Sequence, residues 1–422
     1  MDKYIIIMKN LLILLLLSCI SCSNNHGTDI NGADSLLYIQ IAKPDISSLQ
    51  PLFLSEFSDS IEYVQLETTS ECLLPYYVGG YMSEINNLLF VCDFSAIYQF
   101  DIVTGKFLRR IGRRGQGPGE YQQVNMTINA NDHQILLKTP GKNGLLTYNF
   151  EGKYLGDMHL DNGQDSIFST CFFSLGLAGI GSGFFIFCSS LLPAKQACQP
   201  YELIIYDYKD KKILYSLPNR MEGKYERYSN SINGLSVCVK SSDDVFLYKS
   251  FYNDTLYAIS RNGITPYAII DLGKRKFPVN IIFSQTIGTD MDGKILINSI
   301  FMNKENIYLK CMLIKESILN VNYFICKYNI ITHKITYHSP RIVNDLDGGS
   351  NVDIEDFSFS HAIIPVYPFD EVKDEYKQAV FSTLDKSKIK YPELKEKFEH
   401  MQASRNPDDN PLLMILHLKN DK

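Results

Sequence analysis

A strand, a glycine turn and a second strand follow one another between Ile97 and Arg110, and this unit constrains the fold more than any other feature. The first strand is apolar, Thr104 and Gly105 form the turn, and a loop with four glycines then runs to Tyr121. Glycine adopts positive φ at little cost, so Gly105 can complete a tight hairpin turn. The segment therefore predicts two antiparallel strands in direct succession.

The same strand-and-turn pattern recurs along the chain, with a tyrosine on the strand before each turn. These residues are Tyr98, Tyr148, Tyr206, Tyr257 and Tyr328. They are separated by 50, 58, 51 and 71 residues, whereas blades of four short strands repeat at about 40 to 50 residues. Two later apolar runs, Phe357–Pro365 and Leu412–Leu418, indicate a sixth unit. We expect an all-β fold, a six-bladed β-propeller of four-stranded antiparallel blades.

Two motifs carry a resemblance to a known family. The segment Ile111–Tyr121, rich in arginine and glycine, and the terminal segment Asn410–Leu416 are similar to those of the six-bladed β-propeller lipoproteins of Bacteroidota, relatives of NHL-type and TolB-like propellers. The resemblance covers essentially the whole mature chain. It implies that the early strand Ile61–Glu67 pairs with the last blade and closes the ring.

Composition agrees with one large domain and narrows the ligand classes. The 422 residues include 27 Tyr and 24 Phe, as expected where aromatic side chains pack between pleated sheets. Trp is absent, which disfavours a sugar-stacking surface, although Tyr can partly substitute. The net charge of −6 provides no broad positive field, so no nucleic-acid partner is expected.

The N-terminus predicts export and a lipid anchor. Lys3 and Lys9 precede the apolar run Leu11–Leu17, which is too short to span a bilayer and is typical of a signal peptide. Cys22 follows a small residue, as at a bacterial lipoprotein processing site; Cys19 and an ordinary cleaved signal remain alternatives. We expect an exported lipoprotein on the outer-membrane or periplasmic side, bound to the membrane through lipid.

The domain boundaries follow from composition. Residues 1–21 form the signal peptide, and residues 22–58, rich in Asn, Ser, Asp and Gly, form a flexible tether. Residues 59–422 form the propeller, with a helical insertion at about 369–403. Apolar residues at helical spacing predict one helix there: Phe369, Val372, Tyr376, Val380 and Leu384. A second helix is predicted from Pro392, with Glu393 in its first turn, His400 in its last, and Leu394, Phe398 and Met401 on one face.

The chain has one basic cluster, formed by Arg109, Arg110, Arg113 and Arg114. A guanidinium group beside glycine N–H groups suits a planar anion. The candidate ligand-binding residues are Arg113, Arg114, Gln116, Glu120 and Tyr121. The alternative is that solvated arginines simply flank a turn.

The cysteines and acidic residues of the sequence provide little information about disulfides or metal sites. Cys92, Cys188, Cys238 and Cys326 lie in apolar runs, where cysteine behaves as a small buried hydrophobe. Cys188 and Cys198 flank a loop and are the pair that spacing favours for a disulfide. No cofactor or metal site is expected, although the acidic loop Asp345–Asp356 leaves calcium binding open; its glycines stand at positions four and five rather than six.

Local catalytic motifs are missing from the sequence. There is no HExxH, GxSxG or phosphate-binding GxxxxGK pattern. His333 and His338 are five apart and would face opposite sides of a strand, and single histidines such as His133, His159 and His361 are interpreted as surface or core residues.

Three classes of function are therefore consistent with the sequence. We expect a binding or scaffold module for a protein, peptide or small ligand. The alternatives are an NHL-like hydrolase or lyase with its site at the central axis, and an accessory lipoprotein of a nutrient-uptake system. Enzymatic activity is left undecided.

Overall fold

The computed structural model describes residues 36–74, 81–93, 95–139, 144–158, 176–179, 184–188, 201–218, 237–242, 244–250, 253–277, 291–366, 377 and 380–419. The chain divides into two units, Met1–Leu36 and Leu37–Lys422, and the fold described below is that of the second. The predicted signal peptide, Cys19 and Cys22 lie outside the described residues.

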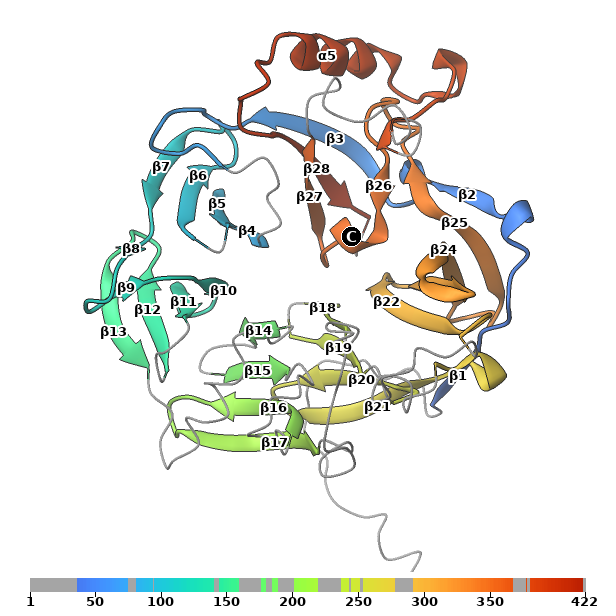
Figure 1. The fold of residues 1–422 in the computed structure, drawn as a ribbon, viewed down its shortest axis with the longest axis horizontal. Helices are drawn as coiled ribbons and strands as arrows, with labels where there is room; N and C mark the ends of the chain where they lie inside the picture. Colours follow the sequence, from blue (N-terminus) through green and yellow to red (C-terminus); the bar gives the residue numbers. More distant parts are fainter. Residues whose placement is uncertain are drawn as a thin grey trace, which may run out of the picture. The chain divides into compact units, whose positions relative to one another are not determined.

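Five antiparallel sheets, each built from consecutive strands, lie around a common centre with their first strands innermost (Figure 1). The first two are β4 (Tyr81–Ile85), β5 (Leu88–Cys92), β6 (Ile97–Asp101) and β7 (Phe107–Arg110), then β10 (Asn125–Asn129), β11 (Gln134–Lys138), β12 (Leu145–Asn149) and β13 (Tyr154–Met158). The third and fourth are β14 (Gly176–Gly179), β15 (Phe184–Cys188), β16 (Tyr201–Asp207) and β17 (Lys212–Pro218), then β18 (Val237–Lys240), β19 (Phe246–Lys249), β20 (Thr255–Ser260) and β21 (Gly263–Asp271). The fifth is β22 (Ile295–Met302), β23 (Asn306–Lys315), β24 (Ser317–Asn329) and β25 (Ile335–Val343), with β26 (Val352–Asp353) paired to β25.

These five sheets are the blades of a β-propeller. The aligned tyrosines fall on the third strand of each, on β6, β12, β16, β20 and β24. Gly105 has φ +72 in the turn between β6 and β7, and a Cβ there would lie 2.0 Å from the carbonyl oxygen of Gln65. The predicted strand before each turn is therefore present, and it is the third strand of each of these five blades.

A three-stranded sheet completes the arrangement, and it joins the two ends of the unit. Its strands are β27 (His361–Val366), β28 (Leu412–Leu418) and β3 (Ser58–Gln65). β3 and β28 are antiparallel, with Leu412 opposite Gln65 and Leu416 opposite Ile61. The expected pairing of Ile61–Glu67 with the last sheet is thus confirmed.

The six-bladed prediction is wrong in its blade count, because five blades with four or more strands are present among the described residues. Where a sixth blade would have its innermost strand, a single antiparallel bridge joins Phe357 to Ala362. The 3-10 helix η5 (Ile354–Asp356) precedes it, begun by a capping box in which the Asp356 carboxylate accepts a hydrogen bond from the Asp353 N–H at 2.8 Å. This capped turn takes the place of an extended strand.

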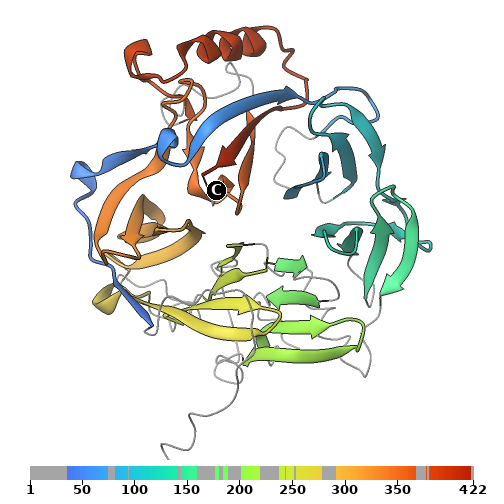
Figure 2. The same ribbon diagram turned by 180° about the vertical axis from the view of Figure 1, so that it is seen from behind.

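The predicted tether of residues 22–58 is also corrected over its second half. β1 (Leu37–Gln40) pairs in parallel with β21, and β2 (Gln50–Phe53) pairs in parallel with β25. Leu37 and Ile39 are buried and alternate with exposed neighbours, which is the pattern of an edge strand on a core. Figures 1 and 2 show this segment along the outer edges of the last two blades. We call residues 37–65, with β1, β2 and β3, the N-terminal strap.

The second predicted helix is confirmed as α5 (Pro392–Ala403), with Pro392 in its first turn. Phe398 is buried, its ring centroid lies 5.0 Å from that of Tyr63 on β3, and Leu394 and Met401 pack on the same core. The first predicted helix lies largely outside the described residues, of which Lys377 and Val380 are helical. The remaining short helices are η1 (Ile46–Ser48), η2 (Leu54–Glu56), η4 (Gly273–Arg275) and η7 (Lys386–Lys388).

Apolar side chains fill the spaces between neighbouring sheets. Cys92 and Cys326 are buried there, as predicted, whereas Cys238 is half-buried. The proposed partner Cys198, and the side chain of Cys188, lie outside what the structure describes. No helix of the described residues is both long enough and apolar enough to traverse a bilayer.

Candidate functional site

The loop that sequence singled out is held together by its own residues. Arg113 Nε donates to Glu120 Oε1 at 2.6 Å, and the Gly117 N–H donates to Glu120 Oε2 at 2.8 Å. These two interactions, the Gly117 N–H first, lower the pKa of the Glu120 carboxyl. Glu120 therefore occupies two of the donors that an external anion would need.

The other predicted site residues are divided between surface and core. Arg114 and Gln116 are exposed, whereas Tyr121 is buried and its hydroxyl donates to the Ile111 carbonyl at 2.7 Å. Burial raises the pKa of Tyr121. Anion binding at Arg114 and Gln116 remains a prediction, but Tyr121 is a packing residue.

The two preceding arginines also bond within the chain. Arg109 Nη1 donates to the Glu151 carbonyl at 2.7 Å, and Arg110 Nε donates to the Glu71 carbonyl at 2.9 Å. The guanidinium of Arg110 also lies 5.2 Å from the centroid of the Tyr98 ring. The basic cluster is therefore mostly a set of links between neighbouring segments.

The glycines of this loop are needed for close packing between the first two blades. Gly112 and Gly119 have φ of +66 and +73. A Cβ on Gly112 would lie 2.6 Å from Tyr148 Oη, and one on Gly119 would lie 2.9 Å from the Tyr154 ring. The hydroxyl of Tyr148 donates to the Gly119 carbonyl. The arginine- and glycine-rich motif is thus explained as a structural joint.

A cavity of about 650 Å³ lies where the innermost strands meet, and it was not anticipated from sequence as a specific set of residues. Three blades contribute to it through the ends of β4, β10 and β18, and the turn before β27 supplies the fourth side. Figure 1 shows these four elements around the centre. We call this space the axial cavity. Its lining residues are Met82, Ser83, Glu84, Ile85, Met126, Thr127, Ile128, Ala130, Asn131, Lys240, Asp244, Phe246, Ser358, Phe359, Ser360 and His361.

His361 is placed by the reduced sheet. It is the first residue of β27 and lies opposite His417 of β28. Ser358 turns the chain back, because its N–H and hydroxyl both donate to the His361 carbonyl, at 2.9 and 2.6 Å. The bridge at Phe357 leaves residues 358–360 as a turn, and this turn lines the cavity.

The imidazole of His361 lies between a hydroxyl and a carboxylate. Its Nδ1 is 3.1 Å from Ser360 Oγ, and its Nε2 is 3.8 Å from Glu84 Oε2, which exceeds hydrogen-bonding distance. Burial lowers the pKa of His361 below 6.5; Glu84 opposes this shift, and His417 and Lys240 add to it. The imidazole is therefore neutral at pH 7 and can accept a proton or a hydrogen bond.

Sequence reasoning missed most of these residues. Glu84, Lys240 and Asp244 were not singled out, and His361 was interpreted as an ordinary histidine. Each lies at the end of an innermost strand or in the turn beside it. A comparison of the residues at the end of the first strand in successive repeats would have brought these residues together.

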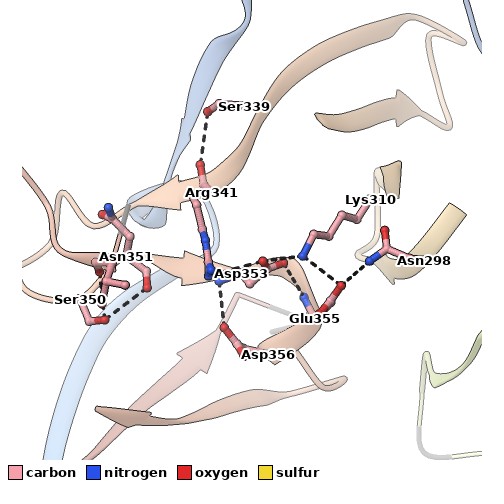
Figure 3. Close-up of polar contacts among 10 residues, drawn as sticks. Asn298, Lys310, Ser339, Arg341, Ser350, Asn351, Asp353, Glu355 and Asp356 are labelled. Atoms are coloured by element: carbon pink, nitrogen blue, oxygen red, sulfur yellow. Dashed lines mark hydrogen bonds and ion pairs between the residues drawn. The ribbon is translucent and has the colours of Figure 1, made fainter. Parts of the chain in front are cut away.

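The acidic loop considered for calcium belongs to an internal network, shown in Figure 3. Lys310 Nζ contacts Asp353 Oδ2 at 2.6 Å and Glu355 Oε1 at 2.9 Å, and Arg341 contacts Asp353 at 3.4 Å. The side chains of Lys310 and Asp353 are only 9% and 10% exposed. Asp356, beside them, has its pKa raised to about 6 by burial. The network fastens η5 to the fifth blade.

The first part of that loop is also satisfied internally. Asp347 accepts hydrogen bonds from the Tyr63 hydroxyl, the Asn344 amide and the Gly349 N–H, at 2.7, 2.7 and 2.9 Å. Asp345 accepts from Ser55. Across the parts of the chain with described coordinates, no three His, Cys, Asp or Glu residues are grouped as metal ligands.

Solved structures show where this fold recurs. One from Bacteroides fragilis NCTC 9343, named "Putative exported protein", has a TM-score of 0.58 and 15% identity, and covers 92% of this chain and 100% of that chain. A member of the duf4221 family from Bacteroides vulgatus ATCC 8482 has a TM-score of 0.46 and 10% identity, and covers 86% of this chain and 98% of that chain. At 15% identity the first likeness concerns the fold alone.

Comparison by sequence gives a family but no function. None of the curated proteins matches the chain. A family model described as "Domain of unknown function (DUF4934)" matches residues 37–417, from β1 to the penultimate residue of β28. The match begins where the N-terminal strap begins and includes all five blades. The chain therefore belongs to the DUF4934 family.

Proposed function

We propose that this protein is an exported, lipid-anchored binding module that takes a small molecule, or the end of a peptide, into its axial cavity. The observation that carries the proposal is the cavity itself. Its volume of about 650 Å³ falls within the range of small-molecule sites, about 300 to 1,000 Å³. Its lining combines apolar side chains with Glu84, His361 and Lys240, which is the composition that orients a polar ligand.

A blocking substitution tests this function without removing any charge. Ser83→Trp would fill the cavity from β4, and Ser216→Trp, on the exposed outer strand β17, is the matched control. The purified proteins are incubated with a periplasmic metabolite extract, filtered, and the retained molecules identified by mass spectrometry. We expect the wild type and S216W to retain the same molecules and S83W to lose them. Equal retention by all three proteins would contradict the axial site.

The anchor is proposed at Cys22, with Cys19 as the alternative. The apolar run Leu11–Leu17 before these cysteines and the resemblance to lipoproteins support it. Labelling of cells with a clickable fatty acid, followed by membrane fractionation, tests the assignment. Cys22→Ser should abolish labelling and release the protein from the membrane. Labelling that survives in C22S and disappears in C19S would move the anchor to Cys19.

A second candidate is a hydrolase or lyase that acts at the axis. Its support is the neutral imidazole of His361 in the cavity, next to Ser360 and Glu84. A neutral imidazole in a cavity is suited to general base catalysis. In the same extract, an enzyme would deplete one compound over time and His361→Gln would not. Retention of an unchanged compound by both proteins would favour the binding module.

A further inference from the structure

We propose that the axial cavity takes a ligand with a positively charged nitrogen next to an apolar group, and that the Glu84 carboxylate binds the nitrogen. This inference rests on the proposed function and specifies the ligand class of the same site. Three features of the lining carry it: the state of Glu84, the balance of charge, and the distribution of apolar side chains.

Glu84 is a carboxylate that lacks a strong partner among the described residues. Its side chain is 26% exposed, and its contact with His361 Nε2 is 3.8 Å long. No hydrogen bond to its oxygens occurs within the described ranges. The unused acceptor positions of this carboxylate are accessible from the cavity, and an ammonium or guanidinium group would supply charge-assisted N–H donors to them.

The charges around Glu84 do not cancel it. His361 is its neighbour and is neutral at pH 7, because burial lowers the pKa of the imidazole. Among the described lining residues, Asp244, in the turn after β18, adds a second carboxylate, and Lys240 is the single lysine or arginine. Lys240 also makes another interaction within the chain. The described part of the lining therefore carries one negative charge in excess, which favours a cationic ligand over an anionic one.

Apolar side chains lie on the same cavity. Met82 precedes Glu84 by two residues on β4, and Met126 lies on the neighbouring β10. Phe246 begins β19 in the fourth blade, and Phe359 lies in the turn before β27. Methionine side chains adapt to varied apolar shapes. They would cover a short hydrocarbon or ring that is attached to the nitrogen.

Matched six-carbon probes test the ligand class. Hexylammonium, hexanoate and hexan-1-ol share one chain and differ in charge, and saturation-transfer NMR at pH 7.5 detects their weak binding to the full protein. We expect saturable binding of hexylammonium and at least about tenfold weaker binding of hexanoate. Tenfold corresponds to about 1.4 kcal/mol, the low end for a hydrogen bond to a charged group.

Variants assign the effect to Glu84. Glu84→Gln should weaken hexylammonium binding by about tenfold while hexan-1-ol is unaffected. Glu62→Gln is the control, because Glu62 also faces a histidine, at 3.7 Å from His417, yet lies outside the cavity lining. Unchanged binding by E62Q is expected. If E84Q does not fold, Glu84→Asp retains the charge at a shorter reach and should bind hexylammonium with intermediate affinity.

The outcomes separate this inference from the function on which it rests. The cationic ligand class is overturned if hexanoate binds more strongly than hexylammonium, or if E84Q leaves hexylammonium binding unchanged. Neither result contradicts a binding site in the axial cavity. Equal metabolite retention by the wild type and S83W overturns the axial site and this inference together.

Discussion

At the scale of single residues, the terminal motif is explained by one amide. Asn410 is fully buried, and its Nδ2 donates to the carbonyls of Glu67 and Cys72 at 2.6 and 2.9 Å, while its Oδ1 accepts from the Leu74 N–H at 2.8 Å. Each donor and acceptor of the amide is used. Asn410 thus links the start of β28 to residues 67–74, which follow β3.

Asn410→Asp should therefore be strongly destabilising. The carboxylate cannot donate, so the carbonyls of Glu67 and Cys72 would each face an acceptor in a buried space. We expect the free energy of unfolding to fall by about 3 kcal/mol or more, measured by urea denaturation. Asn262→Asp, at an exposed turn, should change it by less than about 0.5 kcal/mol. Equal effects of the two substitutions would contradict this role for Asn410.

Asp356 predicts a pH dependence of stability. Burial disfavours the charged form of Asp356 and raises its pKa from the ordinary value of 3.8 to about 6. Between about pH 4 and 6 the folded state holds a proton at Asp356 that the unfolded state has lost, so the stability that Asp356 contributes is fully present below pH 4 and is lost as the pH rises to 6. A shift of two units corresponds to about 3 kcal/mol.

The neighbouring charges, Lys310, Arg341, Asp353 and Glu355, are unchanged by Asp356→Asn. The amide oxygen of D356N can still accept from the Asp353 N–H, but the side chain does not titrate. Urea unfolding of both proteins at pH 4, 5 and 6 should therefore give a flatter pH profile for D356N. Parallel profiles would contradict the shifted pKa.

At the scale of elements, the N-terminal strap depends on strict alternation. Ile39 on β1 is completely buried in the core between the fourth and fifth blades, and Gln40 is exposed. Because side chains alternate across a strand, Ile39 and Gln40 lie on opposite faces of β1, and substituting each of them tests one face.

Ile39→Ala should lower the free energy of unfolding by about 3 kcal/mol, as expected for a large buried side chain cut back to alanine. Gln40→Ala should lower it by no more than about 0.5 kcal/mol. Chemical denaturation of both variants makes the comparison. A loose tether over residues 37–53 would instead give two small and equal effects.

The elements that could be predicted from the sequence are those marked by a pattern of neighbouring residues. Gly105 and the tyrosine-bearing strands identified the blades, and Pro392 identified the start of α5. The capped turn at Asp353 lies just before the run Phe357–Pro365 that was interpreted as a strand, in the acidic segment Asp345–Asp356 that was considered for calcium. β1 was missed because four alternating residues are few within a polar segment. The axial cavity was not predicted residue by residue, because Glu84, Lys240 and His361 come from distant parts of the chain and meet only once the sheets are arranged around the centre.

At the scale of the whole molecule, one pair of strands closes the unit. β3 and β28 are separated by about 350 residues of chain and pair along most of their length. Deletion of Leu412–Leu418 removes the middle strand of the closing sheet and exposes the buried residues beneath it. We expect the truncated protein to lose its cooperative thermal transition, followed by circular dichroism. A truncated protein that still melts cooperatively would show that closure is dispensable.

The N-terminal strap also sets an order of assembly. β1, β2 and β3 leave the ribosome before any blade, yet their partners β21, β25 and β28 are among the later strands to be synthesised. β1, β2 and β3 therefore lack their partner strands until these later strands have been synthesised. Contacts between residues so far apart in sequence form slowly. A chain with this strand order reaches its native state only after β28 is free to pair with β3, so it stays incompletely folded until β28 has been synthesised.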